Sequence, residues 1–150
     1  MLLCGVVDEL ERSDTEVPIL SYFFCQATDR RLDNATAVLR GLIFVFVQQQ
    51  PFLVSYIQAE YEIAGKSLFE GPNAWCALVN ILQSMFDDKR LEGACIVVDA
   101  LDECSTDQRK LLNFILTTSS TYPRIRVACV ESQLGTNRKR LERLNAGNRT

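Results

Sequence analysis

Residues 94–104 constrain the fold of this chain more than any other segment. Their apolar part, residues 95–98, shows no alternation of polar and apolar side chains and is rich in β-branched residues, which is typical of a strand covered on both faces of a parallel sheet. Carboxylates follow at once, at Asp99, Asp102 and Glu103. The segment therefore predicts a buried strand that ends in an acidic cluster.

The position of these carboxylates indicates a ligand site. Ligands of open α/β sheets bind outside the carboxyl ends of the strands, and Mg²⁺ prefers one or two carboxylates together with waters and substrate phosphates. Asp99, at the strand end, is therefore the candidate magnesium ligand, and Asp102 and Glu103 are candidates for orienting a water molecule. The alternative interpretation is a solvated turn in which Asp99 only precedes a helix.

The absence of histidine from all 150 residues excludes Ser-His-Asp catalysis, Cys-His catalysis and imidazole zinc sites. The six cysteines are scattered without C-x-x-C spacing, which is typical of buried thiols in a reducing compartment. For Cys25 and Cys104, packing is favoured over reactivity because no base is near in the sequence. No apolar run is long enough to span a bilayer, so we expect a cytoplasmic protein without a membrane partner.

The charge is unevenly distributed. Residues 1–123 carry nine basic against seventeen acidic side chains, and residues 124–150 carry seven against two. An acidic bulk lacks the electrostatic footprint of a nucleic-acid-binding domain, and the basic stretch at 138–143 is more simply a solvated helix face. We therefore expect no nucleic-acid partner.

Periodicity predicts alternating strands and helices, which is typical of a doubly wound α/β sheet in a single domain over residues 1–150. Asn34 is the expected N-cap of the second helix, Pro51 the start of the third, and Ser105 to Gln108 a capping box before a later helix. Strands are predicted at 17–26, 95–98 and 125–130, and helices at 2–12, 35–50, 51–64, 73–86, from the Ser105 cap onwards, and at 137–144.

One tripeptide imitates a phosphate-binding loop. Gly65, Lys66 and Ser67 spell G-K-S, but Glu60 stands where such a loop needs its first glycine, and a helix rather than a strand precedes it. We interpret Gly65 as the end of a helix, followed by a turn.

Four separated blocks, residues 1–5, 20–26, 35–43 and 97–104, resemble the NACHT domain of STAND-class P-loop NTPases. The form concerned occurs in fungal NLR-like and incompatibility proteins and is also described as the nephrocystin-3-like N-terminal domain. The resemblance implies a three-layer αβα sandwich with a mostly parallel sheet, in which residues 97–99 are the Walker B strand. It implies that Asp99 binds Mg²⁺ with ATP or GTP, and that Glu103 or Asp102 acts on the attacking water.

The same resemblance implies that the first strand and the phosphate loop precede Met1, so that no phosphate-binding residues are assigned here and the sandwich is incomplete. In many relatives a Ser-Ser-Arg segment follows the last strand, where this chain has Glu131 and no arginine. We expect the chain alone to be inactive and to bind nucleotide only if the loop is supplied. The unpaired edge at 125–130 predicts protein partners or self-association.

Two functions follow from these expectations. The first is part of a nucleotide-hydrolysing switch domain of a signalling protein. The alternative is a degenerate, non-catalytic NACHT fragment that acts only as an interaction module or has no function of its own.

Overall fold

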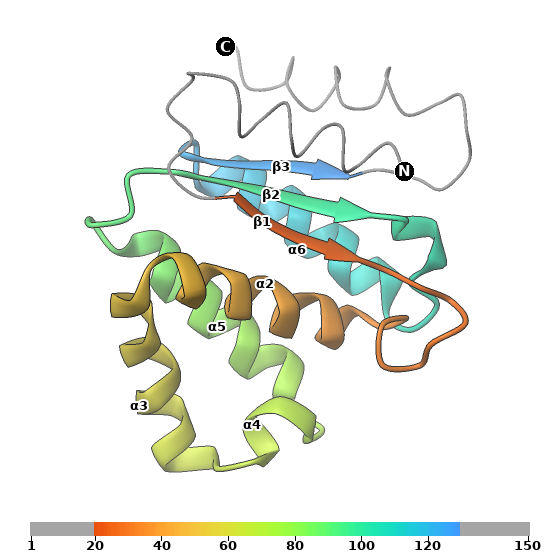
Figure 1. Cartoon of the computed structure of the whole chain (residues 1–150), viewed down its shortest axis with the longest axis horizontal. Coiled ribbons are helices and arrows are strands. Elements are labelled where there is room, and N and C mark those ends of the chain that lie inside the picture. Colours follow the sequence, from red (N-terminus) through yellow and green to blue (C-terminus); the bar gives the residue numbers. More distant parts are fainter. Residues whose placement is uncertain (1–19, 130–150) are drawn as a thin grey trace.

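The computed structural model describes residues 20–129, which form a three-stranded parallel sheet with helices packed against it (Figure 1). The sheet has the order β1-β2-β3, and both neighbouring pairs are parallel. The predicted α/β class with a mostly parallel sheet is confirmed. The segments at 2–12, 131–134 and 137–144 lie outside the described residues. The strands are β1 (Leu20–Phe24), β2 (Ala94–Asp99) and β3 (Ile125–Cys129).

Between β1 and β2 the chain forms the predicted helices and one additional short helix, α4. None of the helices described between residues 20 and 129 is long and apolar enough to cross a membrane. The elements before β2 are α2 (Ala35–Gln49), the 3₁₀ helix η1 (Pro51–Leu53), α3 (Val54–Ala64), α4 (Ser67–Glu70) and α5 (Ala74–Asp87). Those after it are the 3₁₀ helix η2 (Leu101–Glu103) and α6 (Gln108–Thr121).

The described helices pack on one face of the sheet. The strands follow one another in the same direction across the sheet, and right-handed crossovers then place both connections on the same side. A single core cluster contains Ile96 and Val98 of β2 together with Phe46 of α2, Leu82 of α5 and Phe114 of α6. Within residues 20–129, therefore, the layers seen are the sheet and one helical layer of the expected sandwich.

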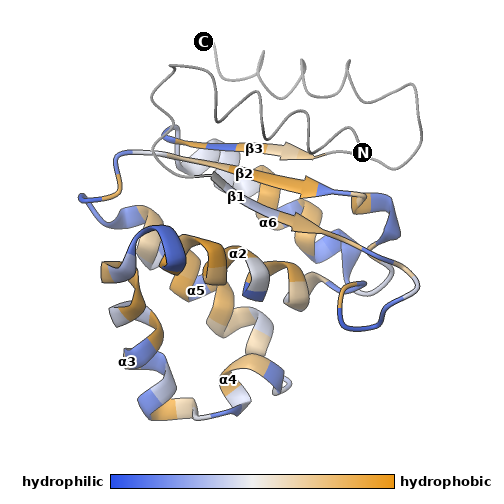
Figure 2. Cartoon of the chain, in the orientation of Figure 1, coloured by the Kyte–Doolittle hydropathy of each residue, from blue (hydrophilic) through white to orange (hydrophobic). Residues whose placement is uncertain are grey.

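The central strand β2 is buried from Ala94 to Val98, and only Asp99 at its end is partly exposed. This pattern confirms the prediction drawn from the absence of alternation. Figure 2 shows the strand coloured as hydrophobic up to a hydrophilic tip. The register places Phe24 of β1 opposite Asp99, so the carboxyl ends of the first two strands lie side by side.

The predicted helix boundaries at Asn34, Pro51 and Gly65 are confirmed. The backbone N–H of Ala37 donates a 2.8 Å hydrogen bond to Oδ1 of Asn34, which is the N-cap of α2. Pro51 opens η1, which continues into α3. Gly65 ends α3 with a φ of 58°, a conformation that glycine adopts without steric cost, so the G-K-S tripeptide is a helix end.

The predicted capping box before α6 is wrong. The N-cap is Asp107, whose φ is 59° and whose side chain makes no capping bond. Ser105 Oγ instead donates to Oδ2 of Asp33 at 3.2 Å, and Gln108 Nε2 donates to the carbonyl oxygen of Leu101 at 2.9 Å. The left-handed turn at Asp107 starts the helix two residues later than the capping box predicted. The side chains of Ser105 and Gln108 therefore bind neighbouring segments instead of capping the helix.

Candidate functional site

The three carboxylates predicted from the sequence follow one another at the carboxyl end of β2. Asp99 is the last residue of the strand, and its Oδ1 accepts a 2.8 Å hydrogen bond from the N–H of Ala100. Ala100 is in the left-handed conformation, with φ 54° and ψ 43°. This turn leads the chain directly into η2, which carries Asp102 and Glu103.

The loop after β1 is attached to both ends of this segment. The N–H of Cys25 donates to the carbonyl oxygen of Asp99 at 3.0 Å, and the N–H of Ala27 donates to Oε2 of Glu103 at 3.1 Å. Glu103 is therefore half-buried and directed towards that loop, whereas Asp102 is exposed. The structure thus gives the two candidate residues different environments.

Burial raises the pKa of Asp99 above its ordinary value, and the nearby charges of Asp102 and Glu103 raise it further, against a lowering by the N–H of Ala100. A divalent cation would offset both the burial and the repulsion. Among residues 20–129 no group of three or more His, Cys, Asp and Glu side chains converges as a metal centre. Mg²⁺ requires only one or two carboxylates, so Asp99 fits this ion, and its assignment stays a prediction.

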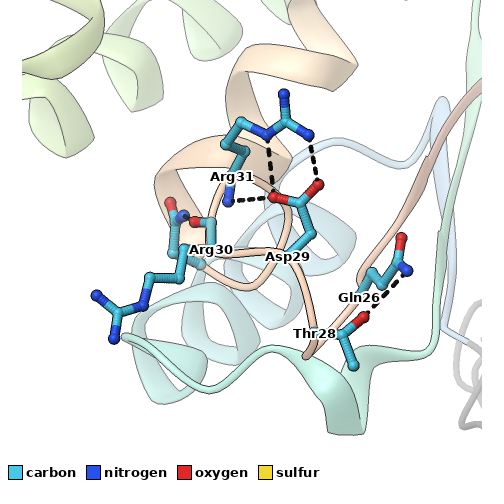
Figure 3. Close-up of polar contacts among 6 residues, drawn as sticks. Gln26, Thr28, Asp29, Arg30 and Arg31 are labelled. Carbon is cyan, nitrogen blue, oxygen red and sulfur yellow. Dashed lines mark hydrogen bonds and ion pairs between the residues drawn. The ribbon is translucent and has the colours of Figure 1, made fainter.

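The loop that follows β1 is held by its own polar contacts (Figure 3). Arg31 donates to both carboxylate oxygens of Asp29, at 3.0 and 2.8 Å, and Gln26 Nε2 donates to Thr28 Oγ1 at 3.1 Å. Arg30 extends away from this pair. The guanidinium of Arg31 therefore stabilises the loop and is already engaged by a carboxylate.

A polar hollow of about 570 Å³ lies where the starts of α2 and α6 meet. A parallel bridge between Asn34 and Thr106 joins the two segments. Asp99, Asp102 and Glu103 do not line the hollow, and the sequence pattern did not reveal it because its walls come from two distant segments. Its lining residues are Arg30, Asp33, Asn34, Thr36, Ser105, Thr106 and Asp107.

Comparison with known proteins gives one family and one curated relative. Residues 1–130 match the family described as nephrocystin 3, N-terminal. The chain is 54% identical over 121 residues to the vegetative incompatibility protein HET-E-1 of Podospora anserina. That match covers 81% of this chain and 9% of the relative, so the chain spans a small part of that protein's length. No solved structure matches.

Proposed function

Since this chain belongs to the nephrocystin 3 N-terminal family and is related to NACHT proteins, we propose that it carries the magnesium-binding part of a nucleoside-triphosphatase switch. In this proposal β2 is the Walker B strand, and the nucleotide is ATP or GTP. The observation that supports it most is the position of Asp99, at the carboxyl end of a buried central parallel strand, with Asp102 and Glu103 in the next turn.

Asp99 and the two carboxylates of η2 have different tasks in this proposal. Asp99 would hold Mg²⁺, which neutralises phosphate charge when nucleotide is bound. Glu103 or Asp102 would orient the attacking water and accept its proton. Glu103 is the better positioned of the two because the N–H of Ala27 fixes its carboxylate through Oε2. The switch would act in an incompatibility or related signalling protein, by analogy with the relative's name.

The binding test is a calorimetric titration with magnesium-ATP and magnesium-GTP. The chain would be titrated alone and joined at Met1 to a strand and phosphate loop. We expect magnesium-dependent binding in the joined form, and Asp99→Asn should abolish it. Glu92→Gln is the matched control, since Glu92 is an exposed carboxylate just before the opposite end of β2. Magnesium-dependent binding that survives Asp99→Asn would contradict the proposal.

Kinetic measurements on the joined form distinguish Glu103 from Asp102 as the residue that orients the attacking water. We expect Glu103→Gln to lower turnover by about 10²- to 10⁴-fold, the range typical of a general base, while nucleotide affinity is kept. Asp102→Asn should then have a smaller effect. The opposite order would assign the role to Asp102, and unchanged turnover in both variants would remove these residues from the chemistry.

A protein-interaction module is the second candidate, and exposed apolar side chains favour it. Phe44 of α2 is 62% exposed, Ile63 of α3 is 84% exposed and Leu116 of α6 is 58% exposed. The three side chains lie on three different helices, so this candidate requires that at least one of them contacts a partner. Association measured by sedimentation for Phe44→Ser, Ile63→Ser and Leu116→Ser would test this function, which predicts weaker self-association or partner binding in at least one variant.

A further inference from the structure

Two cysteine thiols meet next to the carboxylates. Cys25 follows β1 and Cys104 follows η2, and the two side chains are in hydrogen-bonding contact with each other. Both are buried, with 4% and 2% of their surfaces exposed. Cys104 Sγ also donates to the carbonyl oxygen of Thr106 at 3.6 Å. Both cysteines are free thiols.

The backbone holds this pair together. The N–H of Cys25 is bonded to the carbonyl oxygen of Asp99, and the N–H of Cys104 to that of Leu101 at 3.1 Å. The contact between Ala27 and Glu103 lies immediately beside the thiols. Because bonds on both sides fix the two segments against each other, the two sulfur atoms stay neighbours without depending on their own weak interaction.

We propose that Cys25 and Cys104 form a reversible disulfide when the chain meets a peroxide. The Cys104 thiolate would attack one oxygen of hydrogen peroxide and break the O–O bond, giving a sulfenic acid and, after proton uptake by the leaving oxygen, water. Cys25 sulfur would then attack the sulfenic sulfur, release the second water and form the S–S bond. Two thiols and one peroxide thus give one disulfide and two waters.

The electrostatics favour Cys104 as the first thiolate. The hydrogen bond from Cys25 lowers the pKa of Cys104, against a raising by burial and by the carboxylates of Asp33 and Asp107. A thiolate is the nucleophilic form of cysteine, so Cys104 is assigned the attack on peroxide and Cys25 the attack on the sulfenic sulfur.

Small oxidants have a short path to the pair. The segments that flank it, 26–28 and 105–107, are exposed throughout, so a peroxide needs only a local opening of these loops to reach the sulfur atoms. Such openings cost less free energy than global unfolding. We expect the oxidation of Cys25 and Cys104 to be slower than that of an exposed thiol, and to reach completion on longer exposure to peroxide.

The chain contains two matched controls for the pair. Cys95 is buried on β2, and its pKa is raised by burial, although Arg126 lowers it. Cys76 is exposed on α5. Cys95 tests whether burial alone determines the response to peroxide, and Cys76 tests whether exposure alone determines it.

The experiment treats the 150-residue chain with hydrogen peroxide, alkylates the remaining thiols in denaturant and maps the peptides by mass spectrometry. We expect a cross-linked pair of peptides containing Cys25 and Cys104, two hydrogen atoms lighter than the reduced pair, which dithiothreitol separates. Cys95 should remain alkylated as a thiol. Free thiols at both positions after Cys76 is fully oxidised would overturn the proposal, as would a sulfinic acid at Cys104 without the cross-link.

Variants give a second measurement. In Cys25→Ala, Cys104 should progress to irreversibly oxidised forms because no second thiol is present, whereas Cys95→Ala should still form the cross-link. The mapping of the unmodified sequence remains decisive if a variant does not fold. This site goes beyond the proposed nucleotide function: its test measures thiols without nucleotide, so either proposal can fail while the other stands.

Discussion

The ring of Phe23 lies so close to Gly41 of α2 that a Cβ at position 41 would be 2.3 Å from Phe23 Cδ2. Gly41→Ala should gain about 1 kcal/mol of helix propensity, but overpacking against the ring costs about 1–3 kcal/mol. We expect a net loss of stability, measured by urea denaturation.

A second substitution separates the clash from other effects of the Gly41 change. Phe23→Leu removes the ring atoms that the new methyl group would meet. The double variant should therefore be more stable than the sum of the two single changes predicts. Strict additivity would show that the close approach does not limit position 41.

The left-handed turn at Ala100 predicts an unusual direction for a glycine substitution. Its φ of 54° carries a steric cost for alanine, and Ala100→Gly should raise the free energy of unfolding by about 0.5–1 kcal/mol. Ala59→Gly, on an exposed position of α3, should lower it by about 1 kcal/mol. Thermal unfolding of both variants measures the difference. A destabilised Ala100→Gly protein would contradict the assigned backbone conformation.

The N-cap of α2 gives a third prediction. Asn34→Ala removes the acceptor for the Ala37 N–H and should cost about 1 kcal/mol. Asn34→Asp keeps that acceptor and loses only the donation from Nδ2 to the carbonyl oxygen of Arg30, which is 3.0 Å long. In urea denaturation the natural sequence should therefore have the highest free energy of unfolding, Asn34→Asp an intermediate value and Asn34→Ala the lowest. An Asp variant as unstable as the Ala variant would assign the effect to the Arg30 bond.

The link between α5 and β2 predicts a dependence on pH. Arg90 donates to both oxygens of Asp88, at 3.1 and 2.7 Å, and Tyr56 donates its hydroxyl at 2.8 Å. Arg90 also lies 4.2 Å from the ring centre of Phe52. These contacts, above all those of Arg90, lower the pKa of Asp88 below its ordinary value of 3.8.

Because the folded-state pKa is lowered, this stabilisation is present above pH 3.8 and is lost as the pH falls through the folded value. Asp88→Asn should therefore be less stable than the natural sequence at neutral pH, and the difference should shrink below pH 3.8. Denaturation across a pH series measures this. Asp29→Asn is the control, since its exposed pair with Arg31 is screened by solvent and should show a smaller difference.

The sequence correctly predicted the features that depend only on neighbouring residues, namely strand β2 and several helix ends. The unbroken apolar run before Asp99 predicted β2, and Asn34, Pro51 and Gly65 predicted helix ends, because each acts on its own backbone. The start of α6 was missed because the left-handed turn at Asp107 depends on contacts with a distant loop. The bond between Ala27 and Glu103 and the pairing of Cys25 with Cys104 join residues far apart in sequence, so no local pattern could indicate them.

The strand order β1-β2-β3 also determines how the chain folds during synthesis. β1 leaves the ribosome first, but its partner β2 follows only after α2, α3, α4 and α5. At about 5–20 residues per second, β1 waits roughly 4–15 seconds for its partner. The side chain of Phe23, which packs against the core in the folded structure, has no complete sheet beside it during that interval, so slower translation between β1 and β2 would lengthen the time in which a nascent chain can associate wrongly or need a chaperone.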